Sequence, residues 1–177
     1  MPSRQPRPAD PAPLPALRDG YQQDKAALLE RLHAQGASTR GIRSLLRKLS
    51  TLTDRVLCQL WRQAGLQQDW ALVAVGGYGR AELFPHSDVD VLLLMPDGTV
   101  ATGEATRKPI EAFIGSCWDA GLCIGSSVRT VSECLSESAA DVTVQTALLE
   151  SRLVCGSTAL FEAFRQRYDA QMDARAF

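Results

Sequence analysis

Between residues 73 and 94 the chain reads Val73-Ala-Val-Gly-Gly-Tyr-Gly-Arg-Ala-Glu-Leu-Phe-Pro-His-Ser-Asp-Val-Asp-Val-Leu-Leu-Leu94. Residues 71–75 are apolar throughout and predict a short buried strand, and residues 88–95 predict a second strand. Gly76-Gly77 interrupts the pattern after the first strand, where a turn leads into a helix beginning at residue 78. Pro85 ends that helix at residue 84.

The second strand carries two acidic residues on one face. Side chains alternate along a strand, so Asp88, Asp90 and Leu92 share one face and the apolar residues between them share the other. Two carboxylates about 7 Å apart repel each other unless a cation lies between them. Because magnesium binds through one or two carboxylates plus substrate phosphates, we predict that Asp88 and Asp90 are catalytic metal ligands for Mg²⁺ or Mn²⁺.

The paired glycines suit a phosphate. Gly76 and Gly77 lack side chains, so a phosphate can approach the backbone, and N–H groups at a helix start bind its oxygens. Arg80, one turn on, can pair with a phosphate, and Ser87 can add a hydroxyl donor. A Gly-Gly pair that occurs alone is usually part of a turn, and an Asp-x-Asp motif that occurs alone usually lies on a solvent-exposed strand edge. Both motifs adjoin apolar strands here, which favours a nucleotide site.

Composition excludes several other classes of protein. The 177 residues suit one domain, and a net charge of -1 argues against a large nucleic-acid footprint. No apolar run approaches membrane-spanning length, and no secretory h-region is present. Two histidines make a zinc site improbable, and the cysteines are expected to be buried, reduced thiols of a cytoplasmic protein: Cys58, Cys117, Cys123, Cys134 and Cys155.

Outside this stretch the pattern is mostly helical. Proline enrichment predicts a disordered tail over residues 1–20, followed by a domain over residues 21–177. Helices are expected over residues 21–35, from a Ser38 cap to Gly65, and over residues 102–120, with a strand over residues 122–129. A short helix from Thr130 or Ser132, a helix from Asp141 to Val154 and a last helix from Ser157 follow. The expected fold is α/β, a small mixed sheet flanked by helices, with helical segments at both termini.

The pattern of a hydrophobic strand, Gly-Gly, ten residues and Asp-x-Asp resembles the DNA polymerase β-type nucleotidyltransferase superfamily. Within it, residues 76–83 and 85–90 are similar to the N-terminal domain of PII uridylyltransferase/uridylyl-removing enzymes. Further matches support this resemblance over about residues 53–164: Leu60-Trp61, Ala64-Gly65, Trp118-Asp119, Ser127-Val-Arg-Thr130, Asp141-Val-Thr-Val and Leu149-Glu-Ser-Arg152.

The resemblance implies an activity and its partners. Such an enzyme binds UTP with magnesium and transfers UMP to a tyrosine hydroxyl of the nitrogen-signalling protein PII, releasing pyrophosphate. Family members continue into a His-Asp metal hydrolase domain and ligand-sensing ACT domains, so this chain is expected to be a fragment of a longer protein without the uridylyl-removing part. Neither nucleic acid nor membrane is an expected partner.

Two departures from the family pattern matter. The family usually has Gly-His-Ser before Val-Arg-Thr, whereas this chain has Gly125-Ser126-Ser127. The superfamily often adds a third metal carboxylate from a later strand, and residues 122–129 contain none. Asp141 is the nearest candidate metal ligand, although a helix N-cap is its other role. Arg129 is a candidate to face the nucleotide, and Arg152 is expected to pair within the helical region.

Two other functions fit these residues. The first is a protein adenylyltransferase of the same superfamily, which would share the fold and metal site and differ in the base pocket. The second is a non-catalytic nucleotide-binding or docking module. Retention of both aspartates argues against the second, because a pure binder does not need a metal pair.

Overall fold

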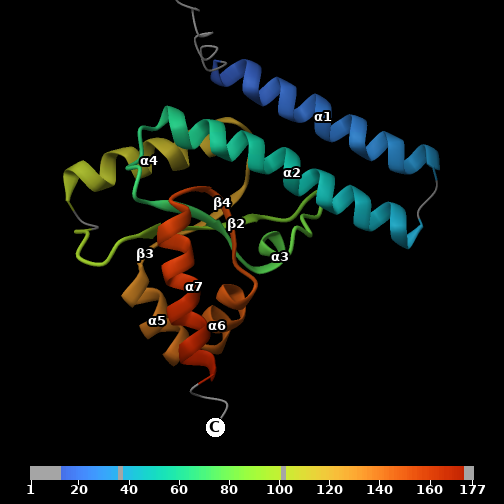
Figure 1. Cartoon of the computed structure of the whole chain (residues 1–177). Coiled ribbons are helices and arrows are strands. Elements are labelled where there is room, and N and C mark those ends of the chain that lie inside the picture. The colour runs from blue at the N-terminus through green and yellow to red at the C-terminus, as the bar shows by residue number, and fades with distance from the viewer. Residues whose placement is uncertain (1–12, 36–37, 101–102, 174–177) are drawn as a thin grey trace, which may run out of the picture.

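A mixed β-sheet lies at the centre of the structure, a computed structural model that describes residues 13–35, 38–100 and 103–173 (Figure 1). The order of its strands is β3-β2-β1-β4. β1 is antiparallel to both β2 and β4, whereas β2 and β3 are parallel. The strand bounds are β1 Ala71–Ala74, β2 Val89–Met95, β3 Ile124–Thr130 and β4 Arg152–Gly156.

Helices α2 (Thr39–Gln63) and α4 (Glu104–Asp119) cover one face of this sheet, and α1 (Leu14–Gln35) packs against them from outside (Figure 1). The apolar spacing of α2 buries one side of the helix, including Leu57 and Leu60, which are fully covered. Ser38 caps α2 as predicted, because its hydroxyl accepts a hydrogen bond from the N–H of Gly41 at 3.1 Å. Pro109 is accommodated inside α4.

The opposite face is covered by α5 (Val131–Ala140), α6 (Val142–Leu149) and α7 (Thr158–Asp173) (Figure 1). Phe164 and Tyr168 of α7 pack there without solvent exposure. Thr130 forms a capping box with Glu133 at the start of α5, which confirms the first of its two predicted starts. The predicted α/β class, a small mixed sheet between helices, is therefore confirmed.

Strand alternation divides the side chains of β2 as the sequence predicted. Val89, Val91 and Leu93 join the core beneath α2, whereas Leu92 and Leu94 join the core beneath α7. Asp90 is on the α7 side, exposed where the strand begins.

The N-terminal prediction needs a correction. Helix α1 begins at Leu14, so residues 14–20 of the predicted tail are helical, and residues 1–12 lie outside the described residues. Pro15 falls in the first turn of α1, where a missing N–H costs no helical hydrogen bond. Leu14 and Leu17 pack against the core beneath α2, which supplies the stabilisation that proline content alone did not indicate.

The predicted helix from residue 78 to 84 is wrong. Helix α3 (Gly76–Gly79) is a single turn that starts on the glycines themselves. Ala81 then adopts a left-handed conformation with φ 58°, and the N–H of Glu82 returns to the carbonyl of Gly77 at 3.1 Å. The chain is thereby turned out of the helix before Pro85.

A predicted helix to Val154 is also wrong. Helix α6 ends at Leu149, and residues 152–156 form β4, which pairs with β1 at the edge of the sheet. The cysteines are free, as expected, but only Cys117 and Cys134 are buried, whereas Cys123 is exposed. Among the described residues, no helix is both long and apolar enough to cross a membrane.

Candidate active site

Four strand ends meet at one edge of the sheet. Antiparallel pairing places the end of β1 beside the start of β2, with Ala74 opposite Val91. Parallel pairing places the start of β3 at the same edge, with Asp90 opposite Gly125. The start of β4 completes the edge, with Arg152 opposite Ala74. The glycine turn and the aspartates are therefore neighbours, and the N–H of Val75 donates to the carbonyl of Asp90 at 3.1 Å.

Asp88 and Asp90 are exposed acceptors at this edge. Among the described side chains, neither carboxylate has a hydrogen-bond donor or a cation within ion-pair distance. Partial burial raises the pKa of Asp90 above its usual value, and the charge of Asp88 raises it further. Two carboxylates that repel each other, and that accept no hydrogen bond from a described side chain, are suited to bind a hard divalent cation such as Mg²⁺.

Gly125 is a residue of the site that the sequence did not single out for this role. A Cβ on Gly125 would come within 2.5 Å of Oδ1 of Asp90, and a Cβ on Gly76 would lie 3.8 Å from Oδ2. The Asp90 carboxylate is thus flanked by two positions without side chains. The sequence shows the Gly125-Ser126-Ser127 motif, but only the parallel pairing of β2 with β3 shows that Gly125 lies opposite Asp90.

The structure requires glycine at two of the three glycine positions of the turn. Gly76 has φ +57°, a conformation that side chains disfavour. A Cβ on Gly79 would lie 1.9 Å from the carbonyl oxygen of Glu150, so packing requires glycine there. At Gly77 a Cβ would make only ordinary contacts, 3.6 Å from Arg80 Nη2 and 3.8 Å from the Glu82 carbonyl. Neither backbone conformation nor packing requires glycine at position 77. Close approach of a ligand to the backbone is the remaining reason for a glycine there.

Arg80 lies beside the turn but is already paired. Its Nε contacts Glu82 at 3.0 Å, and its Nη1 contacts Glu150. Glu82 therefore has a local role, as an ion-pair partner of Arg80. Nη2 faces Gly77, so a phosphate there would share Arg80 with two carboxylates rather than meet a free cation. Ser87 is also engaged, since its hydroxyl donates to the carbonyl of Phe84 at 3.1 Å.

The structure does not bring Asp141 to the aspartate pair. Asp141 caps α6 by accepting a hydrogen bond from the N–H of Thr143 at 2.7 Å, and this bond lowers the pKa of the carboxyl. Within the described residues, no group of three acidic, histidine or cysteine side chains gathers as a metal site would require. The predicted third metal carboxylate is therefore a helix cap in this structure.

A polar network fixes the glycine turn from behind. Arg152 of β4 binds Asp54 of α2 through Nη1 at 2.9 Å and Nη2 at 3.1 Å. The buried Tyr78 donates its hydroxyl to Oδ1 of Asp54 at 2.5 Å, and its ring lies under the Arg152 guanidinium. Burial, together with the charge of Asp54, raises the pKa of Tyr78 well above its usual value. The network joins α2, α3 and β4, and Tyr78 is buried within it.

Two arginine predictions have definite outcomes. Arg129 of β3 pairs with Glu137 of α5 at 2.6 Å rather than standing free for a nucleotide. Arg152 was expected to pair within the helical region, and it pairs with helix α2 from a strand. His86 lies exposed in the loop before β2.

A mixed sheet that carries at one edge a Gly-Gly turn, Asp88 just before β2 and Asp90 within β2 is the arrangement of a nucleotidyltransferase domain. Residues 23–145 match the family described as "Putative nucleotidyltransferase DUF294", and the chain belongs to this family. The match covers more than half of the chain, including the glycine turn, both aspartates and Gly125.

Similar full-length proteins carry a more specific name. The chain is 53% identical over 173 residues to the bifunctional uridylyltransferase/uridylyl-removing enzyme of Burkholderia vietnamiensis (strain G4 / LMG 22486). It is 50% identical over 169 residues to the proteins of the same name from Burkholderia mallei (strain SAVP1) and Burkholderia pseudomallei (strain 668). Each comparison covers 96% of this chain but 19% of the relative, so the chain spans about a fifth of their length.

Proposed function

We propose that this domain transfers UMP from UTP to a tyrosine hydroxyl of the protein PII and releases pyrophosphate. The observation that carries the proposal is the position of Asp88 and Asp90 beside the glycine turn, two carboxylates that accept no hydrogen bond from any described residue. The transferase half of the relatives' printed name favours a uridylyl group. The family resemblance of residues 76–90 supplies PII as the acceptor.

The chain's own residues would perform the binding and positioning. The N–H groups of Gly77 and Tyr78, in the first turn of α3, lack helical partners and are suited to phosphate oxygens. Asp88 and Asp90 would hold Mg²⁺ or Mn²⁺, which when bound neutralises phosphate charge and favours ionisation of the attacking hydroxyl. The new bond joins the acceptor oxygen to the α-phosphorus, and the bond from that phosphorus to pyrophosphate breaks.

The direct experiment incubates the chain with labelled UTP, magnesium and PII. Asp88→Asn and Asp90→Asn each remove a charge from the reaction centre, so each is expected to lower transfer by about 100-fold or more. Asp69→Asn, in an exposed turn away from the sheet edge, is the matched control and should transfer label at the wild-type rate. Wild-type rates in both site variants would disprove the assignment of these aspartates.

Substitution of ATP for UTP tests the adenylyltransferase alternative in the same assay. Transfer of AMP at a rate equal to or above that of UMP would favour the alternative. Binding of UTP without transfer to PII, unaffected by Asp90→Asn, would instead indicate a non-catalytic nucleotide-binding module. The printed names of the relatives favour transfer from UTP over both outcomes.

A further inference from the structure

Exposed cations gather on the outer side of α2. Among the described residues, eight arginine and lysine side chains have no carboxylate within ion-pair distance. Six of them line the hollows along α2 or lie beside them, and we call these six the basic track: Arg31, Arg40, Arg43, Arg47, Lys48 and Arg55. Five belong to α2 and one to α1. The single acidic residue of α2, Asp54, is held by Arg152 and does not neutralise them.

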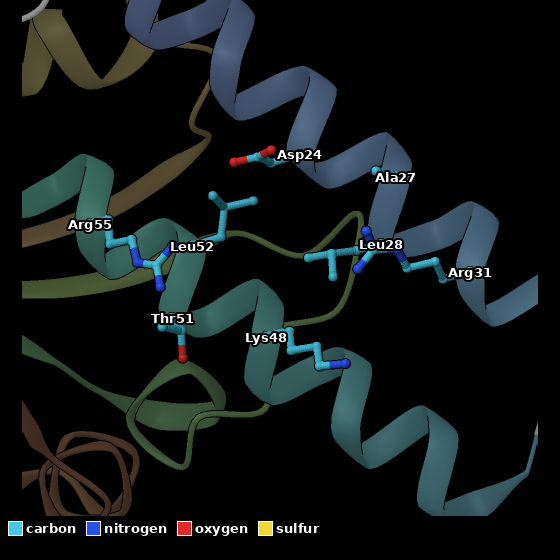
Figure 2. Close-up of a pocket in the computed structure, with 8 residues that line it drawn as sticks. All are labelled: Asp24, Ala27, Leu28, Arg31, Lys48, Thr51, Leu52 and Arg55. Carbon is cyan, nitrogen blue, oxygen red and sulfur yellow. The ribbon is translucent and has the colours of Figure 1, made fainter.

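The track is hollowed and continuous. A cavity of about 260 Å³ lies between α1 and α2. Figure 2 shows the residues that line it, with Asp24 and Arg31 on α1 and with Lys48 and Arg55 on α2. Lys48 also lines a second hollow, together with Arg43 and Arg47. These two arginines line a third hollow with Arg80 and Glu82, the residues beside the glycine turn. The basic track therefore leads from the α1–α2 groove to the candidate active site.

The arrangement opposes helix stability. Arg40 and Arg43 lie near the N-terminus of α2, where the helix dipole disfavours positive charge. Arg43 and Arg47 are four residues apart, so they repel each other along the helix. The whole chain has a net charge of -1, so this positive surface is locally concentrated rather than a product of a basic composition. Charges that destabilise their own helix in this way are expected mainly at functional surfaces, where binding accounts for their presence.

We propose that the basic track docks an acidic surface of the protein that accepts the nucleotidyl group. The proposal rests on the proposed function, in which the acceptor is a protein. An acidic partner would be attracted to the track by long-range charge and oriented along it. Because the track ends at Arg80 and Glu82, a partner bound there would have its acceptor hydroxyl near the glycine turn.

The test compares two double variants of the chain. Arg43→Gln with Arg47→Gln removes two track charges, and Arg62→Gln with Lys108→Gln removes two exposed charges elsewhere on α2 and α4. Binding of PII is measured without nucleotide at about 50 mM and about 300 mM salt, since added salt screens exposed charges. The track variant should bind PII about tenfold more weakly at low salt and depend less on salt, whereas the control should change less than about twofold.

A separate titration with UTP and magnesium distinguishes the two proposals. Both double variants should bind UTP as the wild type does. Loss of UTP binding in the track variant would show that the track serves the nucleotide and would overturn the docking proposal. Unchanged PII affinity in the track variant, absence of PII binding by the wild type at low salt, or displacement of PII by a single-stranded DNA that loses affinity in the same variant would also overturn it. Track-dependent PII binding without any transfer would count against the proposed reaction alone.

Discussion

At the scale of single residues, the site depends on the absence of a side chain at Gly125, beside the Asp90 carboxylate. Gly125 stands opposite Asp90 in the parallel register, and a Cβ there would meet a carboxylate oxygen at 2.5 Å. A side-chain carboxylate can rotate away at little cost, so this contact threatens the position of the ligand group more than the fold. Gly125 is therefore expected to preserve catalytic geometry.

The corresponding substitution is Gly125→Ala. Transfer of UMP should fall by about 100-fold, because a displacement of about 1 Å at a reacting centre has effects of that size. The free energy of unfolding should change by less than about 1 kcal/mol, since alanine suits a strand at least as well as glycine. Gly115→Ala, at a helix position with open space around it, is the control for both measurements. Wild-type transfer by Gly125→Ala would remove Gly125 from the site.

Asp90 itself gives a pH-dependent prediction. Its pKa is raised in the folded state, so ionisation destabilises the folded chain once the pH exceeds the usual pKa of an aspartate. Below that value the carboxyl is protonated in both folded and unfolded states, and the penalty vanishes. Without metal, Asp90→Asn should therefore melt higher than the wild type near neutral pH, and the difference should shrink toward zero below about pH 4.

Thermal melts across this pH range measure the effect, with Asp69→Asn as the exposed control. Addition of magnesium and UTP should reverse the order, because the wild type gains stability from a ligand that the variant binds poorly. A difference in melting temperature that grows as the pH falls would contradict the stated direction of the pKa shift.

At the scale of elements, local pattern predicted the central features and missed those that depend on distant partners. The glycine turn and the alternation of β2 follow from neighbouring residues, so both were predictable from the sequence. β4 was missed because Leu153, Val154 and Cys155 suit a helix or a strand, and only their pairing with β1 decides between them. Helix α3 was predicted to continue to residue 84 because the left-handed Ala81, which turns the chain out of the helix, carries no sequence signal.

The network of Asp54, Tyr78 and Arg152 also escaped prediction, since its members are 24 to 98 residues apart. The informative substitution is Arg152→Lys, which keeps the charge but loses the paired contact with Asp54. The loss should be about 1–2 kcal/mol of unfolding free energy, partly offset because the buried Nε of Arg152 has no hydrogen-bond partner in the described part of the chain. Transfer should fall as well, because the glycine turn loses its support from β4.

Melting temperature and transfer rate are the two measurements. Arg107→Lys is the matched control, since Arg107 pairs with Glu111 on the exposed side of α4 and should contribute less than about 0.5 kcal/mol. Equal losses in the two variants would show that the network has no special structural role. A loss of stability with an unchanged transfer rate would separate the network from the site.

At the scale of the whole molecule, one sheet separates two apolar cores. Trp61 and Trp70 lie in the core beneath α1, α2 and α4, whereas Phe164 and Tyr168 lie in the core beneath α5, α6 and α7. The same strands contribute to both cores, with Leu72 in the first and Val73 in the second. Because the backbone of the sheet is shared, we expect both layers to unfold as one cooperative unit.

The prediction concerns Phe164→Ala, which removes a fully buried ring that contacts Tyr168 at a centroid distance of 5.7 Å. The cavity should cost about 3–5 kcal/mol. Fluorescence from the buried tryptophans of the opposite core should then shift to the same lower midpoint as circular dichroism, although the core that contains Phe164 includes no buried tryptophan among the described residues. Leu149→Ala, an exposed site in the same layer, should leave both midpoints nearly unchanged. A fluorescence midpoint that stays at the wild-type value while the dichroism midpoint falls would show that the two layers unfold independently, and that the sheet does not couple the α7 layer to the α2 layer.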